Sequence, residues 1–169
     1  GSPHLHFEIR DRRMNPFNPF LGGALRIDDT IPPVIRKIAV SPILPGGTVN
    51  GRQQPASFLA HPAGRNRFTI REPIVLVGTA GFAVDVRDRI PLSRFLNGVY
   101  AHTLVIDGTV HYRVRLDRTP GREAHEIGLY YDQVLLDDGQ GRFEKLYMTS
   151  PSNLPFYSPT GTWSGIVDD

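Results

Sequence analysis

The stretch VYAHTLVIDGTVHYRVRL, residues 99–116, decides the fold class because it reads as two strands joined by a tight turn. Apolar and polar residues alternate on both sides of Asp107-Gly108, a pair that a type I′ turn favours. A two-residue turn at that place puts Val105 opposite Val110. We therefore predict an antiparallel β-hairpin.

Continuing this pairing outward gives the hairpin an apolar face and a polar face. The apolar face, which we predict to be core, pairs Val105–Val110, Thr103–Tyr112, Ala101–Val114 and Val99–Leu116. The polar face pairs Leu104–His111, His102–Arg113 and Tyr100–Arg115. Because the neighbouring Arg113 cation disfavours metal binding by the two imidazoles, we interpret His102 and His111 as surface residues.

The remainder of the chain also indicates strands and turns. Its 17 glycines and 15 prolines favour many short strands over long helices. The strands that we predict before the hairpin are Val34–Ser41, Phe68–Arg71, Ile74–Thr79 and Gly81–Arg87. Asn50-Gly51 predicts a second tight turn. The sequence thus predicts an all-β protein.

Alternation assigns faces to two of these strands. In Val34–Ser41, Ile35 and Lys37 are expected on the same side. In Gly81–Arg87, the apolar residues Phe82, Val84 and Val86 are expected to face inward, and the charged residues Asp85 and Arg87 to face outward.

A second hairpin is predicted from Ile127–Leu136 and Arg142–Met148, joined by the acidic loop of residues 137–141. That loop lacks the alternating ligands and the distal Glu of a calcium loop, so we do not interpret it as a calcium site. Residues 149–169 are rich in Ser, Pro and Gly and are expected to be extended.

Composition excludes several classes of protein. Lys and Arg number 19 against 17 Asp and Glu, and no basic run is interleaved with aromatic residues, so nucleic-acid binding is not expected. No apolar stretch reaches the roughly 18 residues that a membrane-spanning helix needs. The absence of cysteine excludes disulfides and Cys-zinc sites.

The segment Pro3–Arg10 alternates without a break and predicts a half-buried strand. His4, His6 and Glu8 lie on the polar side of that strand. Two imidazoles two residues apart can reach one small site, where one could hold a metal and the other a proton. The alternative interpretation is a pair of exposed histidines on a strand.

The string Gly1–Arg10, followed by Asn18-Pro19-Phe20-Leu21, resembles the end of the catalytic domain of lysostaphin/LytM-type zinc peptidases. Enzymes of this family cut peptide cross-links in peptidoglycan. The resemblance implies that His6 is a zinc ligand and that His4 is a catalytic histidine beside the attacking water. Glu8 would be a partner that orients an imidazole, or a solvent-facing residue. A periplasmic or cell-envelope location is also implied.

In that family the other zinc ligands, in a His-x-x-x-Asp motif, precede the histidine pair. No His of this chain is followed four residues later by Asp. We therefore expect the chain to be the C-terminal portion of a peptidase, with its own upstream peptidase domain as a partner. The isolated chain is expected to be inactive and to bind no zinc, although the intact parent would bind Zn²⁺.

Three regions are predicted. Residues 1–27 are the end of the peptidase domain, residues 28–150 an immunoglobulin-like antiparallel β-sandwich, and residues 151–169 an extended tail that could begin a further region. Asp28–Pro33 reads as a stiff linker between the first two. Residues 30–35 also resemble the entry to the sandwich that follows the peptidase domain in some bacterial members of the family.

Three functions are compatible with the sequence. The first is the C-terminal part of a zinc metalloendopeptidase acting on cell-wall peptides. The second is a non-catalytic β-sandwich that docks, positions or gates a cell-wall hydrolase, with peptidoglycan peptides or envelope proteins as partners. The third is a degenerate family member that kept the His-x-His pair, lost zinc and regulates another enzyme.

Overall fold

We describe the protein from a computed structural model, which describes residues 7–23, 25–43, 45–118, 122–152, 154, 157 and 164–167. In these residues antiparallel strands predominate and helix is short, so the prediction of an all-β protein is confirmed. The described part contains no helix of the length and apolarity that a membrane crossing requires.

The strands are β1 (Ile9–Arg10), β2 (Pro16–Phe17), β3 (Val34–Pro42), β4 (Thr48–Val49), β5 (Ala56–Leu59), β6 (His61–Pro62), β7 (Phe68–Thr69), β8 (Leu76–Val77), β9 (Ala80–Arg87), β10 (Ala101–Ile106), β11 (Thr109–Arg115), β12 (Glu144–Lys145) and β13 (Ile166–Val167). The helical segments are the 3₁₀ helices η1 (Leu21–Gly23) and η2 (Arg122–Leu129) and the α-helical turn α1 (Gln133–Asp137).

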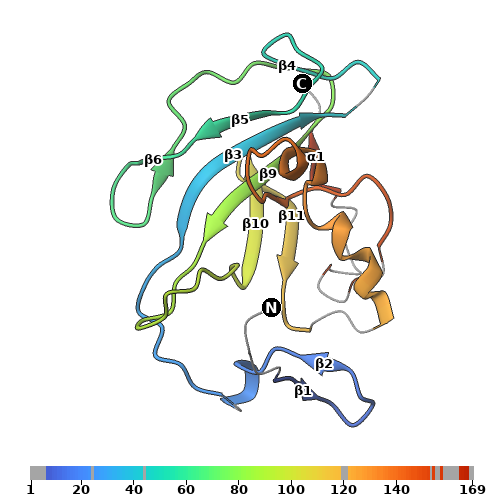
Figure 1. Cartoon of the computed structure of the whole chain (residues 1–169). Coiled ribbons are helices and arrows are strands. Elements are labelled where there is room, and N and C mark those ends of the chain that lie inside the picture. The colour runs from blue at the N-terminus through green and yellow to red at the C-terminus, as the bar shows by residue number, and fades with distance from the viewer. Residues whose placement is uncertain are drawn as a thin grey trace.

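The main sheet is built around β3 and β9, which run side by side through the middle of the molecule in Figure 1. Its order is β12-β9-β3-β5, and β13 also pairs with β9. Because Ile38 pairs with Val84 and Val40 pairs with Phe82, the apolar residues of the two strands share one face.

That first face carries the largest core cluster. Its buried members are Val84, Val86, Val99, Tyr112, Val114, Tyr130, Leu146, Leu154 and Tyr157. The two-stranded β10–β11 hairpin supplies Tyr112 and Val114, so the hairpin is the second layer over the sheet. Val84 and Val86 face inward as predicted. This arrangement does not establish an immunoglobulin-like sandwich, which stays a prediction.

A β-bulge at Arg36 interrupts the pairing of β3 with β9. Ile35 pairs with Val86 and packs against the core cluster, whereas Lys37 pairs with Asp85 on the opposite face. The prediction that Ile35 and Lys37 share a side is therefore wrong, because the extra residue of a bulge shifts the alternation by one.

The second face of the sheet is also covered. Ala39 and Ala83 pack with Leu135 of α1 and with Phe143. Asp85, which was predicted to face outward, is only 1% exposed. The prediction assumed that the second face of the sheet is exposed to solvent. This face instead lies beneath α1 and the loop that follows it. The expectation that Asp85 faces outward is therefore wrong.

The second predicted hairpin is formed only in small part: Tyr131 and Glu144 make an antiparallel β-bridge between its two halves. The rest of the first half contains part of η2 and most of α1, and β12 also pairs with β9. Asp132 is the N-cap of α1, and its side chain accepts a hydrogen bond from the Leu135 backbone N–H. This cap satisfies a backbone donor that would otherwise be orphaned at the helix start, and so favours the helical turn.

The hairpin of β10 and β11 has the predicted turn. Asp107 and Gly108 have φ values of 49° and 77°, as a type I′ turn requires, and Val105 pairs with Val110. Beyond Val105 the register shifts by one, because His111 is an extra residue on β11. Of the predicted pairs in the described hairpin, only Val105–Val110 is formed.

The shift exchanges the two faces of β10. Leu104 pairs with Tyr112 and His102 with Val114, so His102 faces the sheet. The outward residues of β10 are Ala101, Thr103 and Val105, all exposed. The predicted core face is thus correct for Tyr112 and Val114 on β11 and wrong for β10.

The N-terminal segment attaches to the end of β11, and Figure 1 shows β1 and β2 below the hairpin. Asn18 donates from its backbone N–H to the Asp117 carbonyl at 3.0 Å and from Nδ2 to the Leu116 carbonyl at 3.1 Å. Phe17 forms a β-bridge with Arg118. Phe20 remains 50% exposed. The boundary between residues 27 and 28 stays a prediction.

Gly81 is required on β9 because the Tyr147 ring covers it. A Cβ placed there would lie 2.5 Å from Cγ of that ring. We expect Gly81→Ala to lower the free energy of unfolding by about 1–3 kcal/mol, the usual cost of overpacking. Urea denaturation measures the change.

Gly128 provides the matched control, since a Cβ there meets no atom within 4 Å. We expect Gly128→Ala to stay within about 0.5 kcal/mol of the wild type. Equal stability of Gly81→Ala and the wild type would contradict the packing of Tyr147 on β9.

Candidate functional site

The predicted histidine pair, His4 and His6, lies outside the described residues. Glu8 is described and exposed. Its Oε1 accepts from Nε of Arg10 at 2.7 Å and lies 2.5 Å from Nη2 of the same guanidinium. The role of Glu8 as a partner of an imidazole stays a prediction, and its described partner is Arg10.

The structure assembles a different constellation that the sequence did not reveal. Nε2 of His102 lies 2.5 Å from Oε2 of Glu144 and 3.0 Å from the hydroxyl of Tyr130. The Tyr130 hydroxyl in turn donates to Oε2 of Glu144 at 3.0 Å. We call His102, Tyr130 and Glu144 the buried triad.

Three separate elements position the buried triad. The bulge at His111 turns His102 of β10 toward the sheet. Tyr130 follows η2, and its carbonyl accepts the backbone N–H of Lys145 at 2.8 Å. Glu144 of β12 pairs with Val84 of β9, so its side chain shares the face that the hairpin covers.

Burial dominates the electrostatics of Tyr130. Removal from water raises the pKa of its phenol far above the usual value of 10, and the charge of Glu144 raises that pKa further. The phenol is thus a neutral hydrogen-bond donor to the carboxylate. The ring of Tyr131 packs edge-on at 5.0 Å, and burial likewise raises the pKa of Tyr131.

The buried triad is closed to a substrate. An imidazole beside a carboxylate is an arrangement that proton-transfer sites use, but the side chains of His102 and Glu144 are only 8% and 3% exposed. The part of the chain that the structure describes has no group of three or more His, Cys, Asp or Glu residues suited to a metal. The contacts therefore indicate an internal network that ties β10, β12 and Tyr130 together.

Sequence reasoning assigned His102 to the surface, and that interpretation is wrong. The assignment assumed a regular ladder from the Asp107-Gly108 turn to the hairpin ends. No residue type in the stretch marks His111 as the extra residue, since a bulge of this kind needs no glycine. Alternation at Tyr112 and Val114 indicates the buried face of β11, but it does not indicate which residues of β10 share that face.

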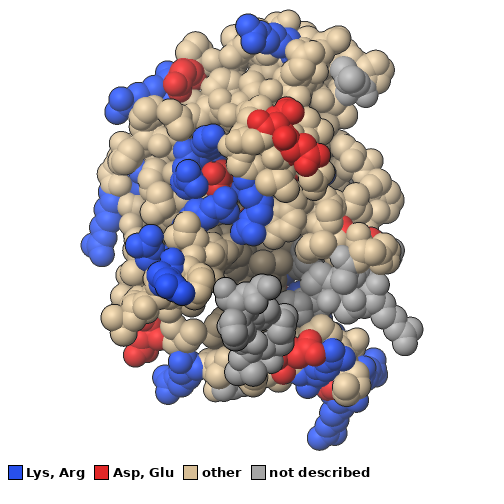
Figure 2. Space-filling view, viewed as in Figure 1, with Lys and Arg blue, Asp and Glu red and all other residues tan. Residues whose placement is uncertain are grey.

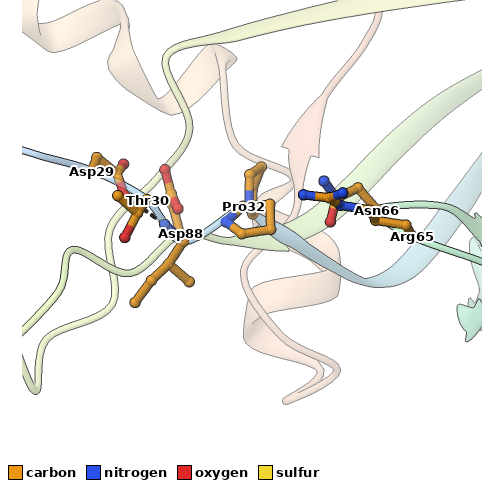
Figure 3. Close-up of a pocket in the computed structure, with 8 residues that line it drawn as sticks. Asp29, Thr30, Pro32, Arg65, Asn66 and Asp88 are labelled. Carbon is orange, nitrogen blue, oxygen red and sulfur yellow. Dashed lines mark hydrogen bonds between the residues drawn. The ribbon is translucent and has the colours of Figure 1, made fainter.

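An open pocket of about 430 Å³ lies beside the linker. Its lining residues are Asp29, Thr30, Ile31, Pro32, Pro33, Arg65, Asn66 and Asp88. Figure 3 shows Asp29, Thr30 and Asp88 at one end and Arg65 and Asn66 at the other. Because acidic and basic groups are separated across an open surface, the pocket has no convergent set of ligand groups.

The chain was compared with models of protein families, with curated proteins and with solved structures, and none of them matches it.

Tyr130→Phe tests the buried triad. The substitution removes one donor from a buried carboxylate, which we expect to lower the free energy of unfolding by about 1–3 kcal/mol. Tyr131→Phe is the matched control, because the Tyr131 hydroxyl has no hydrogen bond among the described residues, and we expect a change of about 0.5 kcal/mol or less. Urea denaturation compares the two. Equal effects would contradict the hydrogen bond to Glu144.

Alkaline pH is expected to unfold the protein. Burial raises the pKa of Tyr147 to about 12 and also raises those of Tyr112 and Tyr130. Because each phenol holds its proton more tightly when folded, this stabilisation is complete below the unfolded pKa of about 10 and is lost as pH rises toward 12.

We expect the phenolate absorbance of these tyrosines to appear together with loss of the circular dichroism signal of the fold. Tyr147→Phe should make the alkaline fall in stability less steep. Ionisation of all six tyrosines near pH 10 with the fold intact would contradict the burial of Tyr112, Tyr130 and Tyr147.

Proposed function

We propose that this chain is the C-terminal portion of a zinc metalloendopeptidase of the lysostaphin/LytM type, which hydrolyses peptide cross-links of peptidoglycan in the cell envelope. The single observation that carries the proposal is the string Gly1–Arg10 with Asn18-Pro19 a short distance on. Both the order of its residues and the spacing of its histidines follow the pattern of that family.

The donor chemistry of the segment suits zinc. Imidazole nitrogen is a common zinc ligand, and a catalytic zinc has three protein ligands and a water. In this proposal His6 is one ligand, and the other two precede His4 in the parent protein. Bound zinc supplies a Lewis acid and lowers the pKa of its water toward 7. His4 holds or moves a proton beside the scissile carbonyl.

Residues 28–150, the predicted β-sandwich region, have an accessory role in this proposal, and the contacts of Asn18 support it. Two hydrogen bonds from Asn18 hold the N-terminal segment to the end of β11. The strand that would carry His4 and His6 belongs to the same segment. The domain would therefore position the peptidase end of the chain, and without the upstream ligands the isolated chain is inactive.

The alternative proposal is a non-catalytic accessory module that docks or regulates a cell-wall hydrolase. The same attachment of residues 16–18 to β11 favours it, because a docking module needs a fixed junction with its neighbour. Retention of the 169-residue chain on isolated sacculi would support wall binding, and passage through them unretained would count against it.

His6→Ala tests the first proposal in the protein that carries this chain together with its upstream peptidase domain. We expect the loss of about one zinc per chain and of cross-link hydrolysis, because a ligand is removed. His4→Ala should keep the zinc and lower kcat by about 10²–10⁴-fold, the range for loss of general acid–base catalysis.

His61→Ala is the matched control, since His61 lies on β6 and the proposal gives it no role. We expect this variant to keep both zinc and activity. Full zinc content and full hydrolysis in His6→Ala would show that the assignment is wrong.

A further inference from the structure

Basic side chains gather where β3 and β9 lie side by side. We call Arg36, Lys37, Arg87 and Arg142 the basic cluster. Figure 2 shows blue side chains grouped over this part of the molecule with one small red spot among them, and a separate acidic patch beside it. The acidic residue at the centre of the basic cluster is Asp85.

The bulge in β3 brings two of these cations to Asp85. Lys37 is the direct pairing partner of Asp85 across the ladder, so the two side chains share a face. The extra residue of the bulge, Arg36, places its Nη1 3.8 Å from Oδ2 of the same carboxylate. A regular ladder would have alternated these two basic residues between the faces of the sheet.

β9 itself supplies the third cation. Arg87 lies two residues beyond Asp85, hence on the same face, and its Nη2 is 3.1 Å from Oδ1. That oxygen has no well-directed hydrogen bond in the described residues. The contact is thus an ion pair between a mostly buried guanidinium and a buried carboxylate.

The fourth cation comes from the loop after α1. The backbone at Gly141 passes so close to Asp85 that a Cβ would lie 3.4 Å from its Oδ2, and this glycine has φ of 132°. Arg142 follows, with its guanidinium carbon 5.2 Å from the centre of the Tyr131 ring. The charges of both Arg142 and Arg87 act on the phenol of Tyr131 and lower its pKa, against the larger effect of burial.

Asp85 does not neutralise this group. Its two oxygens serve Arg87 and, at a long distance, Arg36, whereas Nζ of Lys37 donates to the carbonyl of Gln140 at 2.7 Å. Among the described residues Arg142 has no ion pair, and its buried Nε has no hydrogen-bond partner. Because this group carries more positive than negative charge, a further anion would be stabilised here.

Glu144, the carboxylate nearest to Arg142 in sequence, does not pair with it. Glu144 extends from the opposite face of the sheet and is hydrogen-bonded within the buried triad. Arg36 is half exposed, so the basic cluster is open to solvent on one side. A ligand can therefore reach it without unfolding the domain.

We propose that the basic cluster binds a dianionic oxyanion group, either a phosphate or a pair of carboxylates, from a ligand outside this chain. Guanidinium groups present planar pairs of N–H donors that match the oxygens of such groups, and Lys37 adds a compact charge. Asp85 holds Arg36 and Arg87 in place for the ligand. The proposal goes beyond the peptidase assignment and does not involve zinc.

Titration calorimetry of the full chain at low, constant ionic strength tests the proposal, with inorganic phosphate and malonate as separate probes. We expect saturable binding of at least one probe. Binding of phosphate alone identifies a phosphate-bearing ligand, binding of malonate alone a dicarboxylate, and binding of both a general oxyanion site. Saturable binding of neither would overturn the proposal.

Variants locate the binding. We expect Arg142→Gln to weaken affinity about tenfold or more, because a charged hydrogen bond is lost. Arg36→Gln should weaken the affinity as well. Because Arg36 is half exposed, this variant replaces Arg142→Gln in the test if Arg142→Gln unfolds the protein. The control Arg52→Gln removes an exposed cation beside β4 and should leave affinity unchanged. Unchanged affinity in both cluster variants would overturn the proposal.

Discussion

The pairing of β3 with β9 is the constraint on which the rest of the structure depends. It aligns Ile38 with Val84 on the face that the hairpin covers and Ala39 with Ala83 on the face beneath α1. Both faces of the sheet are therefore buried, as is usual for a central strand pair. Asp85 lies inside the second face, and its burial is tolerated because cations surround it.

The sequence was sufficient for the fold class and for the Asp107-Gly108 turn, because both depend on local chemistry: residue alternation and positive φ. It was insufficient for the two bulges. An extra residue at Arg36 or His111 depends on how the chain packs several residues away, and no residue type marks it. The helical turn α1 was missed for a related reason. A short apolar run can be a strand or a helical turn, and here the burial of Leu135 against Ala39 and Ala83 comes from residues far away in the sequence.

The candidate sites divide in the same way. The His4–His6 motif could be recognised because the residues that define it follow one another in the sequence. The buried triad and the basic cluster each join residues from three separate segments, and each depends on a bulge for its geometry. Sequence spacing cannot assemble such groups, since a one-residue slip moves a side chain to the other face of the sheet.

The attachment of Asn18 to the end of β11 also restrains orientation. The N-terminal segment is held noncovalently at Leu116 and Asp117 and covalently, through residues 24–33, at the start of β3. A segment that is bound to the hairpin as well as joined through a linker has less freedom to reorient than one joined through the linker alone. The hinge freedom expected of a single linker is therefore reduced for as long as the two hydrogen bonds of Asn18 hold.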